Sequence, residues 1–268
     1  MRVQAPFGRR RVAVTHTDDV GAYRVMHAAD PEGPLPWPGQ FYMLASEQRW
    51  GGGDDERPYV PRAFSFLSAG DGALSFMFED VGPGTRRLGE LQPGDGLWIT
   101  GPLGAGFTLP PAGRRAILVG GGIGIPPLSA WASVLTAHDT ALTALLGFRD
   151  AHHAAGAALL ADARVATDDG SVGHHGLVTD LLRAELDAED AEDAAIVYSC
   201  GPPGMLEAVR ALCEQRGVAA QLALEAGMAC GFGACYGCVV ATRDGAYARV
   251  CVDGPVFDAT QLDAVPAH

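Results

Sequence analysis

The sequence contains no long apolar run: no uninterrupted apolar segment reaches the roughly 18 residues that a membrane-spanning helix needs. Its first residues, MRVQAPFGRR, carry positive charge, but no apolar stretch follows them. A signal peptide requires such a stretch, so we expect none. The sequence therefore predicts a protein without a membrane partner.

Positive charge is also scarce. Lys and Arg total 19 against 32 Asp and Glu, which gives a net charge of −13, and the basic residues form no run. A surface that binds the phosphate backbone of DNA or RNA needs clustered basic side chains. We therefore expect no nucleic-acid partner.

Cysteine is absent from the first 199 residues, and four of the six cysteines fall between residues 230 and 251. The disulfide framework of a secreted protein distributes its cysteines over the fold. This crowding predicts a reducing compartment instead, and we expect the protein in the cytoplasm.

Apolar residues make up 48% of the 268 residues, enough for two or three packed domains. Residues 1–108 hold short apolar or alternating runs separated by Gly and Pro. These runs are RRVAVTHTDD, GAYRVMHAAD, QFYMLAS, RAFSFLSAG, GALSFMFED and DGLWITGPLG. Short strands about ten residues apart, with turn signals between them, predict a small antiparallel barrel. The intervening EQRWGGGDDERPYV predicts an exposed loop.

Residues 109–221 alternate between strand and helix patterns. RRAILVGGGIGIPPLSAWASVL predicts a strand, a glycine turn and a helix with proline in its first turn. TALTALLGF is a second strand, and RVATDDGSVGHHGLVTDLLRAEL and AAIVYSCGPPGMLEAVRALCEQRG repeat strand, loop and helix. This order predicts a parallel, helix-flanked sheet. The acidic AELDAEDAEDAA predicts a helix end and a solvated loop, and residues 222–268 form a glycine-rich cysteine domain.

The cysteines of that last domain have the spacing C-x4-C-x2-C-x12-C, from Cys230 through Cys235 and Cys238 to Cys251. This spacing matches the plant-type [2Fe–2S] pattern. Such a cluster is anionic, and glycines at 231, 233 and 237 allow backbone N–H groups to approach its sulfurs. Zinc is the main alternative, although no second C-x2–4-C pair and no nearby His completes a zinc site. A disulfide or a redox dithiol remains a further alternative.

A cluster carries single electrons and needs a source for them. LVGGGIGIPPL suits a phosphate at a helix N-terminus, but Pro126 stands near the position of the third glycine of G-x-G-x-x-G. PRAFSF places Arg62 and Phe64 on one strand face and Ser65 on the other. VGPGT is a glycine turn that ends in a hydroxyl. Alone, LVGGGIGIPPL fits a nucleotide-binding loop and a tight strand–helix connection equally well, whereas PRAFSF favours a plain barrel strand and VGPGT a hairpin.

Taken in order, RAFS, VGPGT, GPLGAGF, GGGIGIPPL and YSCGPPGM resemble the ferredoxin–NADP⁺ reductase superfamily, in which a barrel binds flavin and an α/β domain binds a nicotinamide nucleotide. TDDGSVGHHGLVTDLL, MACGFGACYGCVV and RVCVDGPVFDA further resemble the electron-transfer subunit of class B dihydroorotate dehydrogenase. The resemblance covers nearly the whole chain. It implies a Greek-key flavin barrel, an NAD-binding α/β domain and an iron–sulfur domain.

The resemblance also implies the site residues. Those expected to hold FAD are Arg62, which would anchor the pyrophosphate, Ala63, Phe64, Ser65, Met77, Phe78, Glu79, Gly84 and Thr85. Those expected on the NAD side are Gly120, Gly121, Gly122, Gly124, Cys200, Gly201 and Pro202. Cys230, Cys235, Cys238 and Cys251 would bind the cluster. Cys213 and the histidines His174 and His175 are expected to be structural or surface residues, and no catalytic acid or base is expected.

In that family the subunit pairs with an FMN-containing catalytic subunit, two plus two, in pyrimidine (UMP) biosynthesis. Dihydroorotate is oxidised in the partner, and electrons pass through the cluster and FAD to NAD⁺. Three features depart from the pattern: Phe64 replaces a common tyrosine, Ala226 and Gly227 replace an acidic–basic pair, and residues 50–56 are an insert. After the second α/β strand, Arg149 would favour a 2′-phosphate and Asp150 a free ribose hydroxyl; the resemblance favours NAD.

Two other functions fit the same motifs. One is a related flavin/iron–sulfur diaphorase subunit, such as that of sulfide dehydrogenase or of NADH-dependent ferredoxin–NADP⁺ oxidoreductase. The other is a zinc-stabilised, non-enzymatic nucleotide sensor, which would be colourless.

Overall fold

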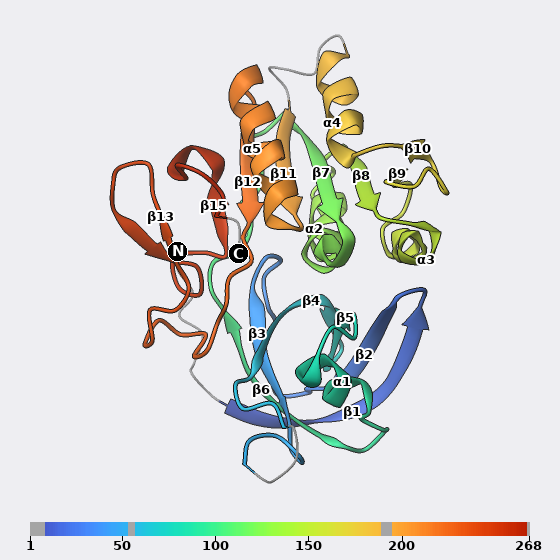
Figure 1. Cartoon of the computed structure of the whole chain (residues 1–268), viewed down its shortest axis with the longest axis vertical. Helices are drawn as coiled ribbons and strands as arrows, with labels where there is room; N and C mark the ends of the chain where they lie inside the picture. Colours follow the sequence, from blue (N-terminus) through green and yellow to red (C-terminus); the bar gives the residue numbers. More distant parts are fainter. Residues whose placement is uncertain (1–8, 53–56, 189–194, 267–268) are drawn as a thin grey trace.

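The computed structural model describes residues 9–52, 57–188 and 195–266. A β-barrel forms one half of the molecule, an α/β sheet forms the other, and the cysteine region lies beside both (Figure 1). The predicted combination of a barrel, a parallel α/β domain and a small cysteine-rich region is thus confirmed. None of the described helices combines the length and the apolar character that a membrane crossing requires.

Six antiparallel strands close the barrel in the order β1-β2-β5-β4-β3-β6. Strands β3, β4 and β5 are successive neighbours, and β6 returns to lie beside β3, which is the Greek-key order. The predicted Greek-key barrel is therefore confirmed. Its elements are β1 (Arg9–Val20), β2 (Tyr23–Ala29), β3 (Phe41–Ser46), β4 (Arg62–Gly70), β5 (Ala73–Phe78), α1 (Pro83–Gly89) and β6 (Gly96–Leu103).

Strand β3 reads FYMLAS and is buried along its whole length. Tyr42 and Leu44 belong to the barrel core. Phe41 and Met43 belong to the core that continues into the α/β sheet. Because successive side chains point to opposite faces, a strand that is apolar throughout must be covered on both sides. Strand β3 therefore joins the barrel to the rest of the fold.

The second sheet has the order β10-β9-β8-β7-β11-β12-β15. All of its pairs are parallel except the last, in which β15 runs antiparallel to β12. Its strands are β7 (Arg115–Gly121), β8 (Leu142–Phe148), β9 (Arg164–Thr167), β10 (His174–His175), β11 (Ala195–Cys200), β12 (Ala219–Ala223) and β15 (Val256–Asp258). The strand order reverses direction between β7 and β11, and ligands bind at such a switch point in open α/β sheets.

Helices cover both faces of this sheet, which confirms the predicted α/β architecture. Side chains of α2 pack with Ala116 and Leu118 of β7. Those of α4 and α5 pack with Ile117 and Val119 on the other face. The helices are α2 (Ile125–Ala137), α3 (Ala151–Ala154), α4 (Val178–Asp187) and α5 (Pro203–Arg216), with the 3-10 turns η1 (Gly122–Gly124), η2 (Ala155–Leu159) and η3 (Ala259–Gln261).

The cysteine region leaves the sheet after β12 and returns to it as β15. Between them lie the cysteine loop and a two-stranded ribbon, β13 (Val239–Ala241) with β14 (Tyr247–Arg249). The N–H of Leu224 donates to the carbonyl of Pro255 at 2.9 Å, and this hydrogen bond joins the two ends of the cysteine region.

Two expected loops are only partly described. The insert includes residues 53–56, which lie outside the described residues, while Trp50 packs against the barrel core. Helix α4 ends at Asp187, within the acidic segment as expected, and residues 189–194 lie outside the described residues.

Candidate functional site

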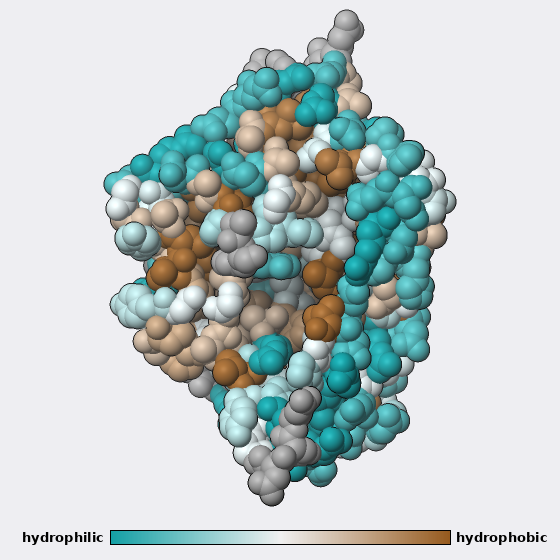
Figure 2. Space-filling model, viewed as in Figure 1, coloured by the Kyte–Doolittle hydropathy of each residue, from teal (hydrophilic) through white to brown (hydrophobic). Residues whose placement is uncertain are grey.

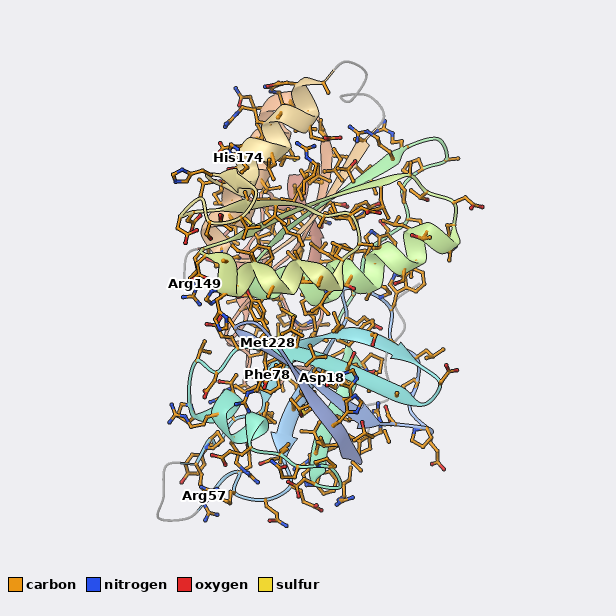
Figure 3. All side chains as sticks on the ribbon, turned by 90° about the vertical axis from the view of Figure 1, so that its right-hand side faces the viewer. Asp18, Arg57, Phe78, Arg149, His174 and Met228 are labelled. Atoms are coloured by element: carbon orange, nitrogen blue, oxygen red, sulfur yellow. The ribbon has the colours of Figure 1, made fainter. Side chains whose placement is uncertain are left out.

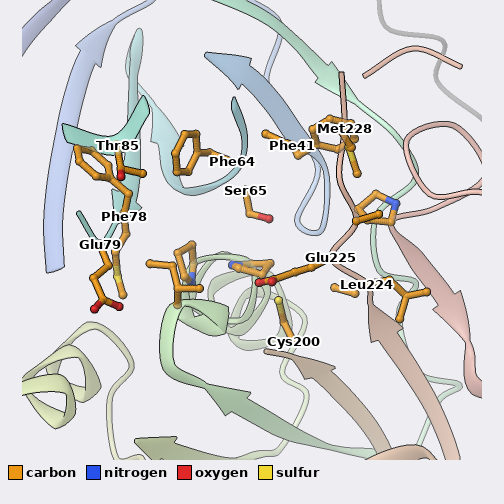
Figure 4. A pocket seen from close by; sticks show the side chains of 18 of the residues that line it. Phe41, Phe64, Ser65, Phe78, Glu79, Thr85, Cys200, Leu224, Glu225 and Met228 are labelled. Atoms are coloured by element: carbon orange, nitrogen blue, oxygen red, sulfur yellow. The ribbon is translucent and has the colours of Figure 1, made fainter. Parts of the chain in front are cut away.

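A cavity of about 310 Å³ opens where the barrel, the α/β sheet and the cysteine region meet; we call it the barrel cavity (Figure 4). The barrel contributes Phe41, Ala63, Phe64, Ser65, Met77, Phe78, Glu79, Val81 and Thr85. The α/β domain and the cysteine region contribute Ile123, Pro126, Pro127, Cys200, Ala223, Leu224, Glu225, Ala226, Met228 and Pro255. The lining is mostly apolar with a few hydroxyl and carboxylate groups, which suits a flat aromatic cofactor.

The pairing of β4 explains why adjacent residues of one strand reach this cavity. Residues Arg62 to Ser65 pair with β3, whereas β5 joins β4 only from Phe66 onward. The first half of β4 is thus a sheet edge that faces the cavity. Ala63, Phe64 and Ser65 all line it, so backbone groups of this edge are available to a ligand.

The predicted pair Arg62 and Gly84 lies next to the cavity lining without belonging to it. A Cβ on Gly84 would stand 2.6 Å from Nε of Arg62, so glycine is needed for this close approach. Nη1 of Arg62 donates to the carbonyl of Val60 at 2.5 Å. The Thr85 hydroxyl accepts from the N–H groups of Val81 and Gly82 at 3.0 and 3.1 Å. VGPGT therefore opens helix α1 rather than a hairpin.

A second cavity, of about 510 Å³, lies at the switch point of the sheet; we call it the sheet cavity. Its lining consists of Tyr23, Glu79, Gly121, Gly122, Ile123, Gly147, Phe148, Arg149, His153, Asp168, Leu177, Val178, Thr179, Pro202, Gly204, Met205 and Ala208. The glycine turn after β7 and the loop after β11 meet here, as the doubly wound order predicts. Its position suits a dinucleotide.

The predicted NAD-side residues divide into two groups. Gly121, Gly122 and Pro202 line the sheet cavity, and Cys200 lines the barrel cavity. The other three allow close packing: a Cβ on Gly120 would meet Leu146 at 2.6 Å, one on Gly124 would meet the Cys200 carbonyl at 2.0 Å, and one on Gly201 would meet Met205 at 2.7 Å.

Charged groups gather where the two cavities adjoin. Oε1 of Glu79 lies 2.6 Å from a guanidinium nitrogen of Arg149 and 3.4 Å from Nε2 of His153. Nε of Arg149 also donates to Nε2 of His153 at 2.9 Å. Asp150 caps α3, and its hydrogen bonds with His153 lower the pKa of its carboxyl. Arg149 and Asp150, the two residues expected to choose between NADP and NAD, are thus both engaged within the protein.

The four cysteines of the cysteine region associate in two pairs. Cys235 helps to set the pKa of Cys230, and Cys238 that of Cys251, so the two thiols of each pair are neighbours. In the described part of the chain, no three cysteine sulfurs lie within 4.8 Å of one another. Four thiolates on one zinc ion at about 2.3 Å would stand roughly 3.8 Å apart. Two cysteine pairs suit a [2Fe–2S] cluster, whose two irons share four cysteine ligands.

Backbone N–H groups point at these sulfurs. The Cys230 sulfur accepts from three residues that follow it, Phe232, Ala234 and Cys235. Although burial works to raise it, these donors lower the pKa of the Cys230 thiol to about 6. The N–H of Gly237 donates to Sγ of Cys235 at 3.4 Å. Burial and the neighbouring Cys238 raise the pKa of Cys251 to about 12, against a hydrogen bond from Gly233. Such donors stabilise an anionic sulfur cluster.

Comparison with known proteins identifies this region. Residues 225–263 match the model of the iron-sulfur cluster binding domain of dihydroorotate dehydrogenase B. The dihydroorotate dehydrogenase B (NAD(+)) electron transfer subunit of Bacillus caldolyticus is 40% identical over 209 residues, which cover 75% of this chain and 79% of that protein. The chain belongs to the dihydroorotate dehydrogenase B electron transfer subunit family. The family predicted from the sequence is therefore confirmed.

Other relatives agree. The electron transfer subunit of Clostridium acetobutylicum is 36% identical over 227 residues, covering 84% of this chain and 85% of that protein. A solved NADH-dependent reduced ferredoxin-NADP oxidoreductase has a TM-score of 0.79 at 24% identity and covers 96% of this chain and 91% of its own. A ferredoxin NADP+ reductase from Neisseria gonorrhoeae, solved with bound FAD and NADP, has a TM-score of 0.63 at 17% identity, covering 78% and 92%. These structures share the fold of the electron transfer subunit family.

Sequence reasoning missed several lining residues. Phe41 comes from β3, and Pro126 and Pro127 open α2 after the glycine turn. The segment before the cysteines contributes Leu224 to Ala226 and Met228. The two prolines directly follow the glycine turn, and EAGM directly precedes the cysteine motif. Their closeness to these motifs in the sequence could have identified them. No local signal marks Phe41.

Proposed function

We propose that the barrel cavity holds FAD, the sheet cavity holds NAD⁺ and the four cysteines hold a [2Fe–2S] cluster. The chain then serves as the electron transfer subunit of dihydroorotate dehydrogenase B in UMP biosynthesis. The observation that carries this proposal is the position of the barrel cavity. Glu79 and Ile123 line both cavities, and Met228 lines the barrel cavity two residues before Cys230.

FAD exchanges a hydride with a nicotinamide and single electrons with an iron–sulfur cluster, so it suits a position between the two. The chain's own residues orient and enclose it. Phe64 and Phe78 pack beside each other with ring centroids 5.9 Å apart, and Cys200 is buried, which raises the pKa of its thiol well above the usual range. Cys200 therefore lines the cavity as a neutral thiol. This apolar lining keeps water from the reacting face.

Residue roles follow from the same placement. Arg62, beside Gly84, offers paired N–H donors to the FAD pyrophosphate. The edge of β4 at Ala63 to Ser65 faces the flavin ring, and Met77, Phe78, Glu79 and Thr85 complete its enclosure. Gly121, Gly122 and Pro202 contact the dinucleotide, while Gly120, Gly124 and Gly201 let the two loops approach. Because Arg149 is paired with Glu79, the site prefers NAD⁺ to NADP⁺.

The partner is an FMN-containing catalytic subunit, in a heterotetramer of two plus two, in the cytoplasm. Apolar side chains reach the surface over the cysteine region, on the left of the face in Figure 2. Phe232, Tyr236, Val239 and Tyr247 are all exposed there, as is Cys235. Exposed aromatic groups around a redox centre are typical of a docking surface.

We assign residues 1–108 to FAD, 109–221 to NAD and 222–268 to the cluster. Strand β15 lies in the cluster segment but pairs with β12 of the NAD segment, so these two segments share one sheet.

Anaerobic purification tests the proposal. We expect yellow-brown protein with one FAD and two acid-labile sulfides per chain, reduced by NADH. Mixed with the FMN subunit, it should reduce NAD⁺ with dihydroorotate as donor. Activity with sulfide or reduced ferredoxin instead would identify a related diaphorase subunit. Colourless, zinc-containing protein would contradict the proposal altogether.

A further inference from the structure

Three metal-binding side chains meet on the outside of the barrel, away from both cavities. His16 and Asp18 lie two residues apart on β1, so they point to the same face of the strand. His27 of β2 stands directly opposite His16 in the register. A β-bulge between Val14 and His16 precedes them, and bulges re-aim the side chains that follow. Figure 3 labels Asp18 on the barrel.

The ligand atoms of the three side chains lie within 4.8 Å of one another. Oδ2 of Asp18 is 3.7 Å from Nε2 of His16 and 3.4 Å from Nε2 of His27. Both distances exceed those of a good hydrogen bond, so Asp18 does not fully satisfy either imidazole. Nitrogen and oxygen ligands at about 2.0–2.1 Å from a tetrahedral metal ion would stand roughly 3.3 Å apart. The ligand atoms are therefore already near the spacing of a metal site, and the orientation of one imidazole ring has to change.

The surroundings favour this use. Nδ1 of His16 shares a hydrogen bond of 3.1 Å with the Thr15 hydroxyl. When Nδ1 donates it, Nε2 presents its lone pair toward Asp18, which is how metal-bound histidines are oriented. The two imidazole rings are stacked, 4.1 Å apart and tilted by 4°. Because a metal ion lies in the plane of each ring, one ring must turn, and the side chain of His16, 56% exposed, is free to do so.

We propose that His16, Asp18 and His27 form a binding site for a divalent transition metal ion, of which Zn²⁺ is the representative. Two imidazoles and one carboxylate suit borderline ions rather than Mg²⁺ or Ca²⁺. Three protein ligands leave one position for water. The ion links β1 to β2 near their hairpin, where the N–H of Ala22 donates to the carbonyl of His152 in the α/β domain at 3.2 Å.

Calorimetric titration of Zn²⁺ into the holoprotein, with FAD and cluster in place so that the cysteines are occupied, tests the site. We expect one saturable site per chain. His16→Ala and His27→Ala should each weaken it at least tenfold, and Asp18→Asn should weaken it measurably. Zn²⁺ should also raise the Tm of the wild type but not that of the His16→Ala, His27→Ala double variant, because only a folded site binds the ion.

His174→Ala is the matched control. His174 is also exposed and lies 3.6 Å from a carboxylate oxygen, that of Asp180, but among the described residues it belongs to no group of three such ligands. This variant should bind Zn²⁺ as the wild type does. The proposal is overturned if the wild type shows no saturable binding, or if a double variant that retains FAD and its metal-free Tm binds Zn²⁺ with unchanged affinity.

Discussion

Glu79 of the barrel and Arg149 of the α/β domain form an ion pair across the border between the two cavities, with 2.6 Å between carboxylate oxygen and guanidinium nitrogen. In Figure 3, Arg149 lies where the barrel and the α/β domain meet. The pair belongs to neither site alone, because Glu79 lines both cavities and Arg149 lines the sheet cavity. In the proposed NAD⁺ site, the barrel thereby contributes to the charges that the nucleotide would meet.

Replacing Glu79 by Gln should release Arg149. A free guanidinium pairs readily with a 2′-phosphate. We expect the ratio of kcat/KM for NADPH to that for NADH, measured with ferricyanide as acceptor, to rise about three- to tenfold, or roughly 1 kcal/mol. The double variant Glu79→Gln, Arg149→Leu should lose this gain. An unchanged ratio in Glu79→Gln would show that Arg149 does not reach the nucleotide.

Tyr23→Phe should weaken nucleotide binding without destabilising the protein. Tyr23 lines the sheet cavity, and its buried hydroxyl has no hydrogen-bond partner within the described ranges. We expect this hydroxyl to gain a partner when the nucleotide binds, so KM for NADH should rise about fivefold in the variant, near 1 kcal/mol. Tyr198→Phe is the control: its hydroxyl donates to the Thr108 carbonyl at 2.9 Å, so this variant should lose about 1 kcal/mol of stability and keep its KM.

Cys235→Ser should remove the cluster and spare the flavin. We expect most iron and acid-labile sulfide to be lost, while FAD content and NADH–ferricyanide activity stay within about twofold, since NADH reacts at FAD. Cys213→Ala is the control, because burial on α5 raises the pKa of Cys213 to about 12 and keeps it a thiol. Iron loss in Cys213→Ala alone would contradict the ligand assignment.

Tyr247→Arg should weaken the complex with the FMN subunit. Tyr247 is 76% exposed on β14, which pairs with β13, the strand that follows Cys238 directly. Placing a charge on an apolar docking surface should raise Kd at least tenfold in a sedimentation or surface-binding assay. Tyr59→Arg changes a side chain that is 71% exposed elsewhere and should leave Kd unchanged. Equal effects in both variants would show that the partner does not dock on the cysteine region.

Glu185→Gln should lower stability in a pH-dependent manner. Burial works to raise the pKa of Glu185, but Arg115 and Arg164, each 2.7 Å away, outweigh it and hold that pKa below the usual value. The carboxylate therefore stabilises the fold above the unfolded-state pKa, and this contribution is lost as the pH falls through the folded-state pKa. Urea unfolding should show a loss of about 1–2 kcal/mol at pH 7 that shrinks below about pH 4.5.

Glu90→Gln is the control for the pH dependence of Glu185→Gln. Glu90 pairs with Arg87 at 3.2 Å and with Arg49 at 3.3 Å at the barrel surface, and each such surface pair contributes at most about 0.5 kcal/mol. A difference between wild type and Glu185→Gln that stays constant from pH 7 to pH 4 would show that the charge of Glu185 is not its source.

Local patterns were sufficient for most strands and helices and for the cysteine segment, although helix α1 was not predicted from VGPGT. The apolar run of β7 and the glycine turn after it are each contained in a few consecutive residues, and so is the spacing from Cys230 to Cys238. Backbone sterics and side-chain periodicity act over that range, so these features could be read directly.

Contacts between distant segments could not be predicted in this way. Gly231 has a positive φ of 78°, and a Cβ there would meet Met43 of the barrel at 2.5 Å, so it accommodates another strand as well as the cysteine loop. Gly120 likewise faces Leu146 rather than the sheet cavity. A glycine can make room for a ligand or for a neighbouring strand or helix. Which of the two applies depends on tertiary packing, and a short sequence motif carries no information about that packing.

The return of β15 to the sheet has a consequence for electron flow. Because the cysteine region leaves the sheet after Ala223 and rejoins it at Val256, it is anchored at both ends and cannot swing as a tethered carrier would. The fold therefore holds the flavin and the cluster at a fixed distance from each other. We expect the rate of this internal step to be independent of solvent viscosity, so that only the encounter with the partner subunit responds to diffusion.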